Sequence, residues 1–321
     1  MSEATQRDVD DKSTRTSIDP VALMRIKNLQ LRAKAVVEGF YNGLHRSPFH
    51  GFSVEFSEYR PYTTGDDPRT LDWKLYARSD RYYIKRYEDE TNRRCYLLVD
   101  QSKSMGFGSL DYTKADYART LAATLAHFLT LQRDAVGMLT FDQSVNEFIA
   151  ARHRTGHMRR LLACLDQTTA GTGTDLRQPL EQLAALVNKR GLIVLISDLL
   201  APLEHLRTHL GYLRSRGHEM FILRINDPAE IELKLTEASM LRDMETGAQI
   251  FVDPDVARSQ YQTNFRRHEA ELVSICDSLG IRLTSMITDQ PMDRALFDLL
   301  SLESRRVGSR HAAGQSKGSR S

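Results

Sequence analysis

The sequence has little cysteine: Cys95, Cys164 and Cys276 are the three among 321 residues, and they lie far apart in the chain. No C-x-x-C pair is present, which excludes a zinc site built on cysteine pairs. A disulfide-held secreted domain is not supported either, because such domains carry many cysteines in a short chain. Isolated cysteines in apolar stretches are typical of a reduced protein core, so we expect a cytoplasmic protein.

Long apolar runs are also missing. The most apolar segment, residues 191–200 (GLIVLISDLL), is interrupted by Asp198. It is far shorter than the roughly 20 residues that a membrane-spanning helix needs. The N-terminal region lacks the apolar stretch of a signal peptide. We therefore expect no membrane span.

A large excess of one charge is absent, since 44 Lys and Arg stand against 42 Asp and Glu. The net charge of +2 is concentrated at the C-terminus, where residues 303–321 carry five basic residues and one acidic residue. A neutral body gives no reason to expect nucleic-acid binding. Residues 1–19 and 303–321 have few large apolar side chains, so we expect disordered tails. Binding of nucleic acid or an anionic surface through the basic tail remains an alternative function.

Short apolar strands alternate with amphipathic helices over residues 91–302. This alternation predicts an α/β domain of Rossmann type, with a doubly wound, mostly parallel sheet. Continuously apolar strands such as residues 192–196 (LIVLI) indicate that helices cover both faces of the sheet. Hairpins are expected through residues 143–144 and 245–247. A single helix over residues 20–38 precedes this domain, followed by a turn-rich segment up to residue 90 in which we expect strands over residues 52–56 and 82–87. We assign residues 20–90 to a separate, β-rich module.

Polar side chains gather at three strand or loop ends of the predicted domain. They are Asp100, Ser102 and Ser104 after one strand, Thr172, Thr174 and Asp175 in a glycine-rich loop, and Ser197 and Asp198 after a second strand. Ligands of open α/β sheets bind beyond the carboxyl ends of the strands. Carboxylate and hydroxyl oxygens without His or Cys suit Mg²⁺ or Mn²⁺ better than Zn²⁺. The alternative is a set of capped turns, in which Asp and Ser accept backbone N–H groups.

The D-x-S-x-S pattern, the distant threonine and the aspartate after a second strand resemble the metal-ion-dependent adhesion site of von Willebrand factor A domains. The matching residues are Asp100, Ser102, Ser104, Thr174 and Asp198. The resemblance implies that they hold a divalent cation, directly or through water, and leave one position open for a partner's carboxylate. Asp175 would support a ligand or cap the next helix. Ser197 would support a ligand or bond the backbone.

Upstream, residues 51–90 resemble the signature of the bacterial family called domain of unknown function 58. The signature is met by Arg60, Tyr62, Gly65, Asp66, Arg69, Leu71, Trp73, Ala77, Arg78, Glu88 and Glu90. This resemblance implies a MoxR-type AAA+ ATPase as partner and an adaptor role for the protein. Aromatic and Arg side chains often anchor interfaces. The candidate partner-binding residues are Arg60, Arg69, Trp73 and Arg78, and the alternative is that they form the module's own core and ion pairs.

An enzymatic function finds less support in the sequence than a binding function. No G-x-S-x-G or P-loop motif is present, which argues against a serine hydrolase of that type and against an intrinsic P-loop ATPase. A Mg²⁺-dependent, phosphatase-like hydrolase using Asp100 as nucleophile is the alternative. That chemistry normally needs a second acid two residues on, where this chain has Ser102. We therefore expect a non-enzymatic, cation-dependent protein-binding module.

Overall fold

The computed structural model describes residues 18–46, 58–62, 76, 81–86, 93–167, 176–187, 189–233, 239–242, 249–252 and 254–302. The chain divides into two compact units, of which the larger combines residues 1–43 with residues 93–321. Residues 44–92 form the smaller unit. The described part contains no helix that is both long and apolar enough to cross a membrane.

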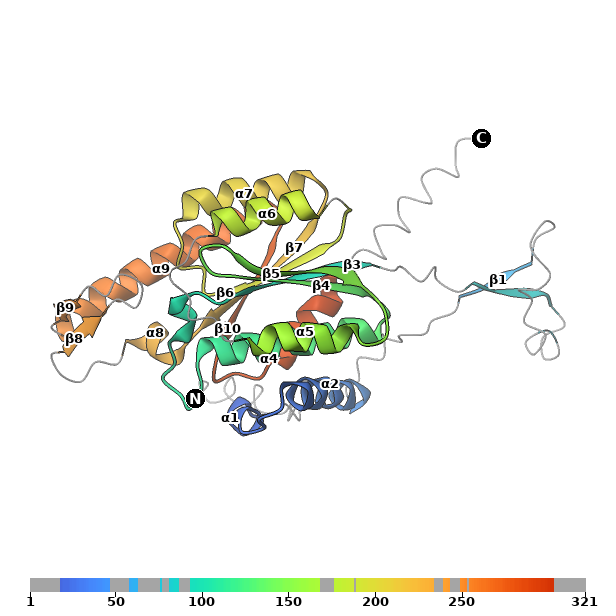
Figure 1. The fold of residues 1–321 in the computed structure, drawn as a ribbon, viewed down its shortest axis with the longest axis horizontal. Coiled ribbons are helices and arrows are strands. Elements are labelled where there is room, and N and C mark those ends of the chain that lie inside the picture. Colours follow the sequence, from blue (N-terminus) through green and yellow to red (C-terminus); the bar gives the residue numbers. More distant parts are fainter. Residues whose placement is uncertain are drawn as a thin grey trace, which may run out of the picture. The chain divides into compact units, whose positions relative to one another are not determined.

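A six-stranded sheet in the order β10-β7-β6-β3-β4-β5 forms the centre of the larger unit (Figure 1). Its strands are β3 (Arg94–Asp100), β4 (Ala135–Phe141), β5 (Val145–Arg152), β6 (Leu192–Ser197), β7 (Glu219–Asn226) and β10 (Arg282–Ile287). Only the edge strand β5 runs antiparallel to its neighbour, and the other pairs are parallel. The predicted doubly wound, mostly parallel sheet is confirmed, and so is the hairpin through residues 143–144.

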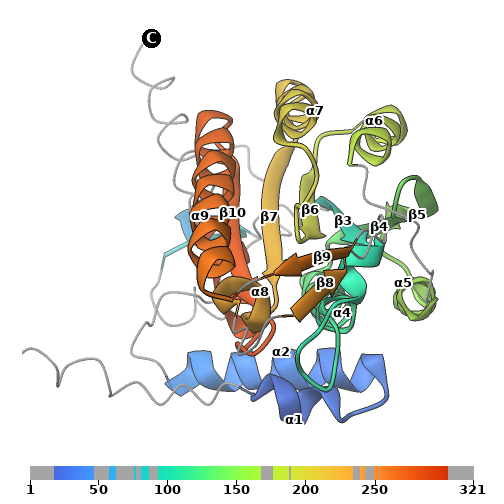
Figure 2. The same ribbon diagram turned by 90° about the vertical axis from the view of Figure 1, so that its left-hand side faces the viewer.

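Helices cover both faces of this sheet, with α6 and α7 on one side and α4 and α5 on the other (Figures 1 and 2). These helices are α4 (Lys114–Leu131), α5 (His157–Asp166), α6 (Arg177–Leu186) and α7 (Leu203–Ser215). Every residue of β6 is buried, as expected for an apolar strand covered on both faces. Cys95, Cys164 and Cys276 are all buried, which confirms their place in the core.

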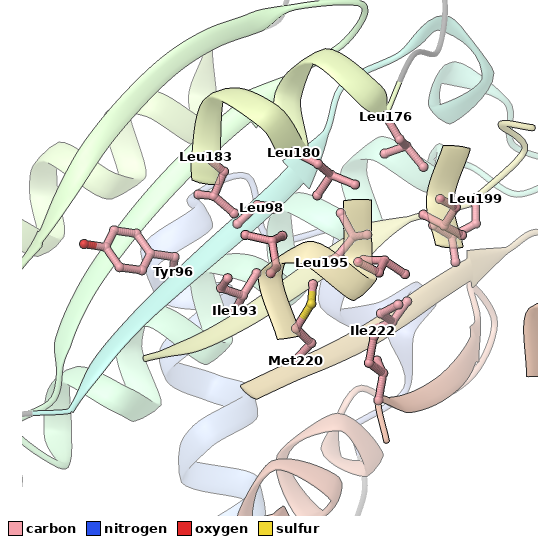
Figure 3. Packing of buried hydrophobic residues seen from close by; sticks show 14 of the residues in the cluster. Tyr96, Leu98, Leu176, Leu180, Leu183, Ile193, Leu195, Leu199, Met220 and Ile222 are labelled. Carbon is pink, nitrogen blue, oxygen red and sulfur yellow. The ribbon is translucent and has the colours of Figure 1, made fainter. Parts of the chain in front are cut away.

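The core on the α6 and α7 face shows how alternate strand residues meet the helices (Figure 3). Ile193 and Leu195 of β6 pack with Leu180 and Leu183 of α6. The same cluster includes Leu272 from the long helix α9 (Pro254–Ser278). The remaining elements are α8 (Pro228–Glu232), the predicted hairpin of β8 (Ser239–Arg242) and β9 (Gln249–Val252), and a helix over residues 293–302.

The N-terminal helix differs from its prediction, because two helices replace the single helix expected over residues 20–38. The first is α1 (Pro20–Met24), and the second is α2 (Leu29–Arg46), which continues past Gly39. The side chain of Asn28 accepts a hydrogen bond from the backbone N–H of Leu31, which favours a fresh helix start after α1.

The position of α2 also corrects the expected domain boundary. Phe40 of α2 contacts the rings of Phe128 and Phe297 edge-on, with centroids 5.8 and 4.7 Å apart. Arg32 donates to the hydroxyl of Thr120 on α4 over 3.2 Å. The helix therefore packs on the sheet domain and does not belong to the β-rich module, because Phe40 contacts both α4 and the helix over residues 293–302.

We expect Phe40→Ala to lower the free energy of unfolding by about 3 kcal/mol, because truncating a buried Phe loses apolar contact and leaves a cavity. Phe40 is only 3% exposed. Denaturant unfolding would measure the loss. Leu31→Ala is the matched control on the same helix, since Leu31 is 55% exposed and its truncation should change stability little. Equal effects of the two substitutions would contradict the packing of α2 on the sheet domain.

In the smaller unit, β1 (Glu58–Pro61) and β2 (Tyr83–Arg86) form an antiparallel pair in which Arg60 stands opposite Ile84. The strand predicted near residues 82–87 is thus confirmed. The rings of Tyr76 and Tyr82 stack at 4.5 Å, so part of the aromatic content of this unit packs within it. Arg69, Trp73 and Arg78 lie outside the described residues, as does the strand expected over residues 52–56.

Candidate metal centre

The strand order brings two of the three predicted polar clusters together. After β3 the chain continues to β4 and β5 on one side, whereas β6, β7 and β10 lie on the other. The change of side lies between β3 and β6, whose carboxyl ends are in register through Val99 and Ile196. Such a switch point is where α/β sheets bind ligands. Asp100 and the pair Ser197–Asp198 follow this register directly, so they meet at the switch point.

Asp100 is fully buried at the end of β3, with 1% of its surface exposed. Its Oδ2 accepts a hydrogen bond of 2.5 Å from the hydroxyl of Ser197, and its Oδ1 accepts one of 2.8 Å from the backbone N–H of Ser102. The Ser197 hydroxyl in turn accepts from the N–H of Leu199. Ser197 therefore links the two strand ends and fixes the orientation of the Asp100 carboxylate.

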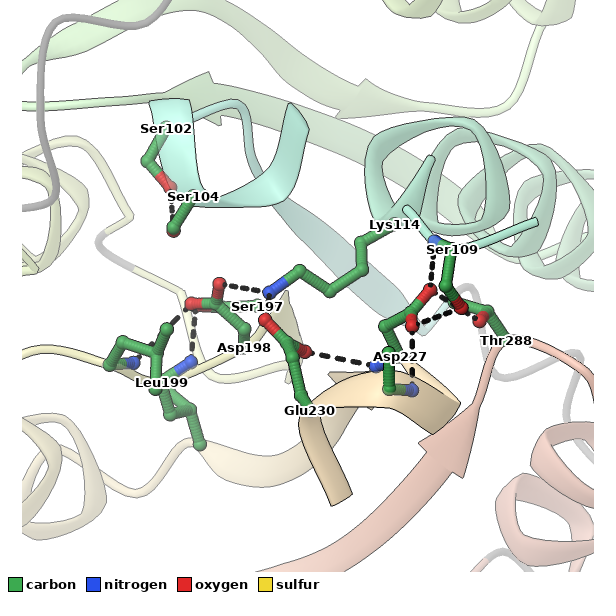
Figure 4. A network of polar contacts seen from close by, with 12 residues as sticks. Ser102, Ser104, Ser109, Lys114, Ser197, Asp198, Leu199, Asp227, Glu230 and Thr288 are labelled. Carbon is green, nitrogen blue, oxygen red and sulfur yellow. Dashed lines mark hydrogen bonds and ion pairs between the residues drawn. The ribbon is translucent and has the colours of Figure 1, made fainter. Parts of the chain in front are cut away.

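The hydroxyls of Ser102 and Ser104 lie side by side, with their Oγ atoms 3.1 Å apart (Figure 4). Both side chains are buried, on and just before the short 3₁₀ helix η2 (Lys103–Gly106). Ser102 precedes this helix, yet its side chain makes no capping hydrogen bond there. The capped-turn alternative therefore accounts for the Asp100 bond to Ser102 N–H but not for the Ser102 hydroxyl.

This donor set fits a small divalent cation. Neighbouring oxygens in an octahedral shell with metal–oxygen distances of about 2.1 Å are about 3 Å apart, close to the separation of the two serine hydroxyls. No group of three or more His, Cys, Asp or Glu side chains with metal-binding geometry occurs among the described residues. A cation at this place would thus depend on mixed carboxylate and hydroxyl oxygens, a set typical of Mg²⁺ or Mn²⁺.

Asp198 takes part in a buried ion-pair network (Figure 4). The Lys114 ammonium, which is 0% exposed, donates to Asp198 Oδ2 over 2.9 Å and to Glu230 Oε1 over 2.6 Å. Asp198 Oδ1 accepts from the N–H of Leu200 at 3.3 Å. The Asp198 carbonyl accepts from Nε of the buried Arg224, also at 3.3 Å. The second carboxylate of the site therefore already carries a positive partner.

Burial and charge strongly perturb the titration of this centre. Desolvation and the nearby charge of Asp198 raise the pKa of Asp100 to about 7, although hydrogen bonds from Ser197 and Ser102 act in the opposite direction. Burial alone would lower the pKa of Lys114, but Asp198 and Glu230 outweigh it and raise that pKa. Lys114 is therefore charged at neutral pH, whereas Asp100 changes its protonation state close to neutrality.

A second network holds the loop that follows η2 (Figure 4). Asp227 accepts hydrogen bonds from the backbone N–H of Ser109 at 2.9 Å and from its hydroxyl at 2.5 Å. Thr288 approaches the same carboxylate at 3.5 Å, and Tyr112 donates to the Thr288 carbonyl at 2.7 Å. Asp227 also caps α8, the helix that carries Glu230. These bonds fix the loop after Ser104 relative to α8.

Lys114, Glu230 and Asp227 did not emerge from the sequence as site residues. Their local signals were present, since Thr113 with Asp116 and Asp227 with Glu230 form capping boxes that mark the starts of α4 and α8. These signals locate helix starts. They do not reveal that the two starts face each other across the sheet edge.

The other predicted site residues lie outside the described part of the larger unit. Thr174 and Asp175, with the rest of their loop, lie outside the described residues. Arg60 belongs to the smaller unit, where its backbone lies in β1. Four of the five expected cation ligands are therefore described: Asp100, Ser102, Ser104 and Asp198.

A protein family and a mycobacterial relative each match most of this chain. The sequence pattern of a family described as "Protein of unknown function DUF58" matches residues 58–271. A Mycobacterium tuberculosis protein described as "Uncharacterized protein Rv1480" is 28% identical over 277 residues, which cover 85% of this chain and 86% of the relative.

Two solved structures are similar to this chain at low sequence identity. The conserved hypothetical protein BatB from Bacteroides thetaiotaomicron is 14% identical, with a TM-score of 0.46 over 66% of this chain and 99% of that chain. The SpRpn10 VWA domain is 14% identical, with a TM-score of 0.39 over 64% of this chain and 93% of that chain.

Proposed function

This chain belongs to the DUF58 family, and we propose that it is a protein-interaction module whose binding site is completed by Mg²⁺ or Mn²⁺. The observation that supports this proposal is the group of buried oxygens at the β3–β6 switch point. Asp100, Ser102 and Ser104 lie on one side and Asp198 on the other, in the order of the metal-ion-dependent adhesion pattern. In the proposal, Thr174 completes the set.

When bound, the cation supplies an electrophilic position that a carboxylate oxygen of a partner protein can occupy. The chain's own residues prepare this position. Ser197 and the N–H of Ser102 orient Asp100, and the bonds of Asp227 to Ser109 fix the loop beyond the two serines. The partner thus meets donors that need little rearrangement, which lowers the entropic cost of binding.

The backbone after Asp198 supports a docking role for this edge of the sheet. Leu199 has a φ of 57°, a left-handed conformation that costs a residue other than glycine about 1–3 kcal/mol. Its buried side chain and its carbonyl bond to the His268 ring hold it there. The strained turn leaves Leu200 52% exposed beside Asp198. An apolar side chain next to a cation position suits a partner segment that combines a carboxylate with an apolar residue.

The partner that we propose is a MoxR-type AAA+ ATPase in the cytoplasm, for which this protein acts as a non-enzymatic adaptor. The resemblance of residues 51–90 to the family signature supports this choice. Within the proposal, Arg60, Arg69, Trp73 and Arg78 of the smaller unit form a second partner-binding surface, and Asp175 supports the ligand set with Ser197.

A capture experiment tests the proposal. We expect the tagged full-length protein to retain a MoxR-type ATPase from the same genome in millimolar Mg²⁺ and to lose it in EDTA. The double variant Ser102→Ala/Ser104→Ala should lose the ATPase even with Mg²⁺, because both hydroxyl donors are gone. Ser278→Ala, which removes an exposed hydroxyl on α9, is the control and should retain it. Equal recovery in all arms would exclude a cation-bridged interaction.

A further inference from the structure

Lys114 is an unusual neighbour for a cation site. Its ammonium is fully buried, lies 2.9 Å from Asp198 Oδ2 and 2.6 Å from Glu230 Oε1, and approaches the Phe107 ring at 6.0 Å. Lys114 is the first residue of α4, and the capping box of Thr113 and Asp116 fixes where that helix starts. The helix start therefore sets a permanent positive charge against one of the proposed cation ligands.

We infer that Lys114 is a built-in cation that competes with the divalent ion for Asp198 and limits the affinity of the site for metal. This inference rests on the proposed metal-binding function and deepens it. The ammonium and a divalent cation are both attracted to the Asp198 carboxylate, and they repel each other at this distance. Metal binding then requires Lys114 to give up its bond with Asp198.

Glu230 provides the place to which the ammonium withdraws. Its Oε1 already accepts from Lys114, while its Oε2 accepts from the N–H of Asp227 at the start of α8. The Glu230 side chain is thus held in position whether or not Lys114 also binds Asp198. Two carboxylates share one ammonium in the described structure, and metal binding would leave Glu230 as its principal partner.

Removing the Lys114 charge should raise metal affinity. A unit charge within about 4–6 Å changes the proton affinity of a carboxyl group by roughly tenfold to a thousandfold. We expect a divalent ion to gain at least about tenfold in Lys114→Met, measured by calorimetric titration of the full-length protein with MgCl₂. Lys103→Met is the control, because Lys103 is an exposed basic residue of η2 beside the same serines. It should change the affinity less than Lys114→Met.

Thermal unfolding supplies a second readout that does not depend on partner binding. The metal-free Lys114→Met protein should melt below wild type, because Asp198 and Glu230 lose their common partner. Saturating Mg²⁺ should raise its Tm by more than it raises that of wild type. If Lys114 were purely structural, the metal-free variant would melt below wild type, but Mg²⁺ would not raise its Tm by more than it raises that of wild type. That result would overturn the inference.

Glu230→Gln tests the same competition without removing the lysine. The ammonium then depends more strongly on Asp198, so Mg²⁺ affinity should fall. In the Lys114→Met background this fall should shrink, because there is no ammonium to redirect. A fall of the same size in both backgrounds would mean that Glu230 acts only through its own charge, and it would overturn the inference.

The outcomes separate this inference from the proposed function. If wild type binds Mg²⁺ and Lys114→Met binds no more tightly, the inference fails while the metal site stands. If only Lys114→Met binds Mg²⁺, Lys114 excludes the metal from wild type, and the proposed metal-dependent function fails. If neither protein binds, both are wrong. If Lys114→Met does not fold, Glu230→Gln decides the question alone, since unchanged Mg²⁺ affinity would overturn the inference.

Discussion

Asp100→Asn is expected to lower the Mg²⁺ affinity of the protein by more than about 100-fold and, at the same time, to stabilise the metal-free protein at neutral pH. Loss of a residue that only orients a metal ligand costs roughly 10–100-fold in affinity, and Asp100 contributes the negative charge itself. The amide can still accept the bond from Ser102 N–H, so the turn after β3 has no need to rearrange. A loss of Mg²⁺ affinity would therefore be due to the missing negative charge.

Calorimetric titration with MgCl₂ measures the affinity, and denaturant unfolding in EDTA measures the stability. Asp111→Asn is the matched control, because Asp111 is an exposed carboxylate in the loop that follows η2. It should leave both quantities nearly unchanged. An Asp100→Asn protein that loses stability in EDTA and keeps its Mg²⁺ affinity would show that Asp100 is a structural cap, as in the alternative interpretation.

The second large effect is a pH dependence of the metal-free protein. Folded Asp100 has a pKa of about 7, because burial and the Asp198 charge disfavour its ionised form. An unfolded Asp loses its proton near pH 3.9. The folded state thus binds the extra proton between these values, and the free energy of unfolding falls as the pH rises from about 4 to about 7. The expected contribution of this one group is on the order of 4 kcal/mol.

Urea unfolding in EDTA at a series of pH values would detect this contribution as a difference between wild type and Asp100→Asn. The free energy of unfolding of the variant should increase relative to that of wild type as the pH rises through this window, because the variant cannot ionise at this position. Saturating Mg²⁺ at pH 8 should remove much of the difference in free energy of unfolding by which wild type falls below the variant, since a bound cation compensates the charge of the two carboxylates. Parallel pH profiles for the two proteins would contradict the raised pKa.

The fold and one side of the candidate site could be predicted because they depend on local patterns. Apolar strands of five or six residues, each ending in polar residues, were enough to predict a parallel sheet with Asp100 and Asp198 at the carboxyl ends of their strands. The partners of these carboxylates could not be predicted from the sequence. Lys114 follows β3 and Glu230 follows β7, and the two side chains meet only because β6 pairs with β3 on one side and with β7 on the other.

The N-terminal helix shows a second limit. Its apolar spacing predicted a helix but not the element that would cover it, because amphipathic periodicity does not identify the partner of an apolar face. Proximity in the sequence suggested the β-rich segment. In the structure, Phe40 instead packs against Phe128 and Phe297, which are distant in the chain and close in space.

Because α2 packs on the sheet unit, residues 44–92 are an insertion between two segments of that unit. The chain leaves the sheet unit near the end of α2 and returns to it just before β3, so both ends of the smaller unit are joined to the same folded body. A single backbone cleavage within it would leave two fragments that remain associated, because the contacts of α2 with α4 do not depend on covalent continuity through residues 44–92.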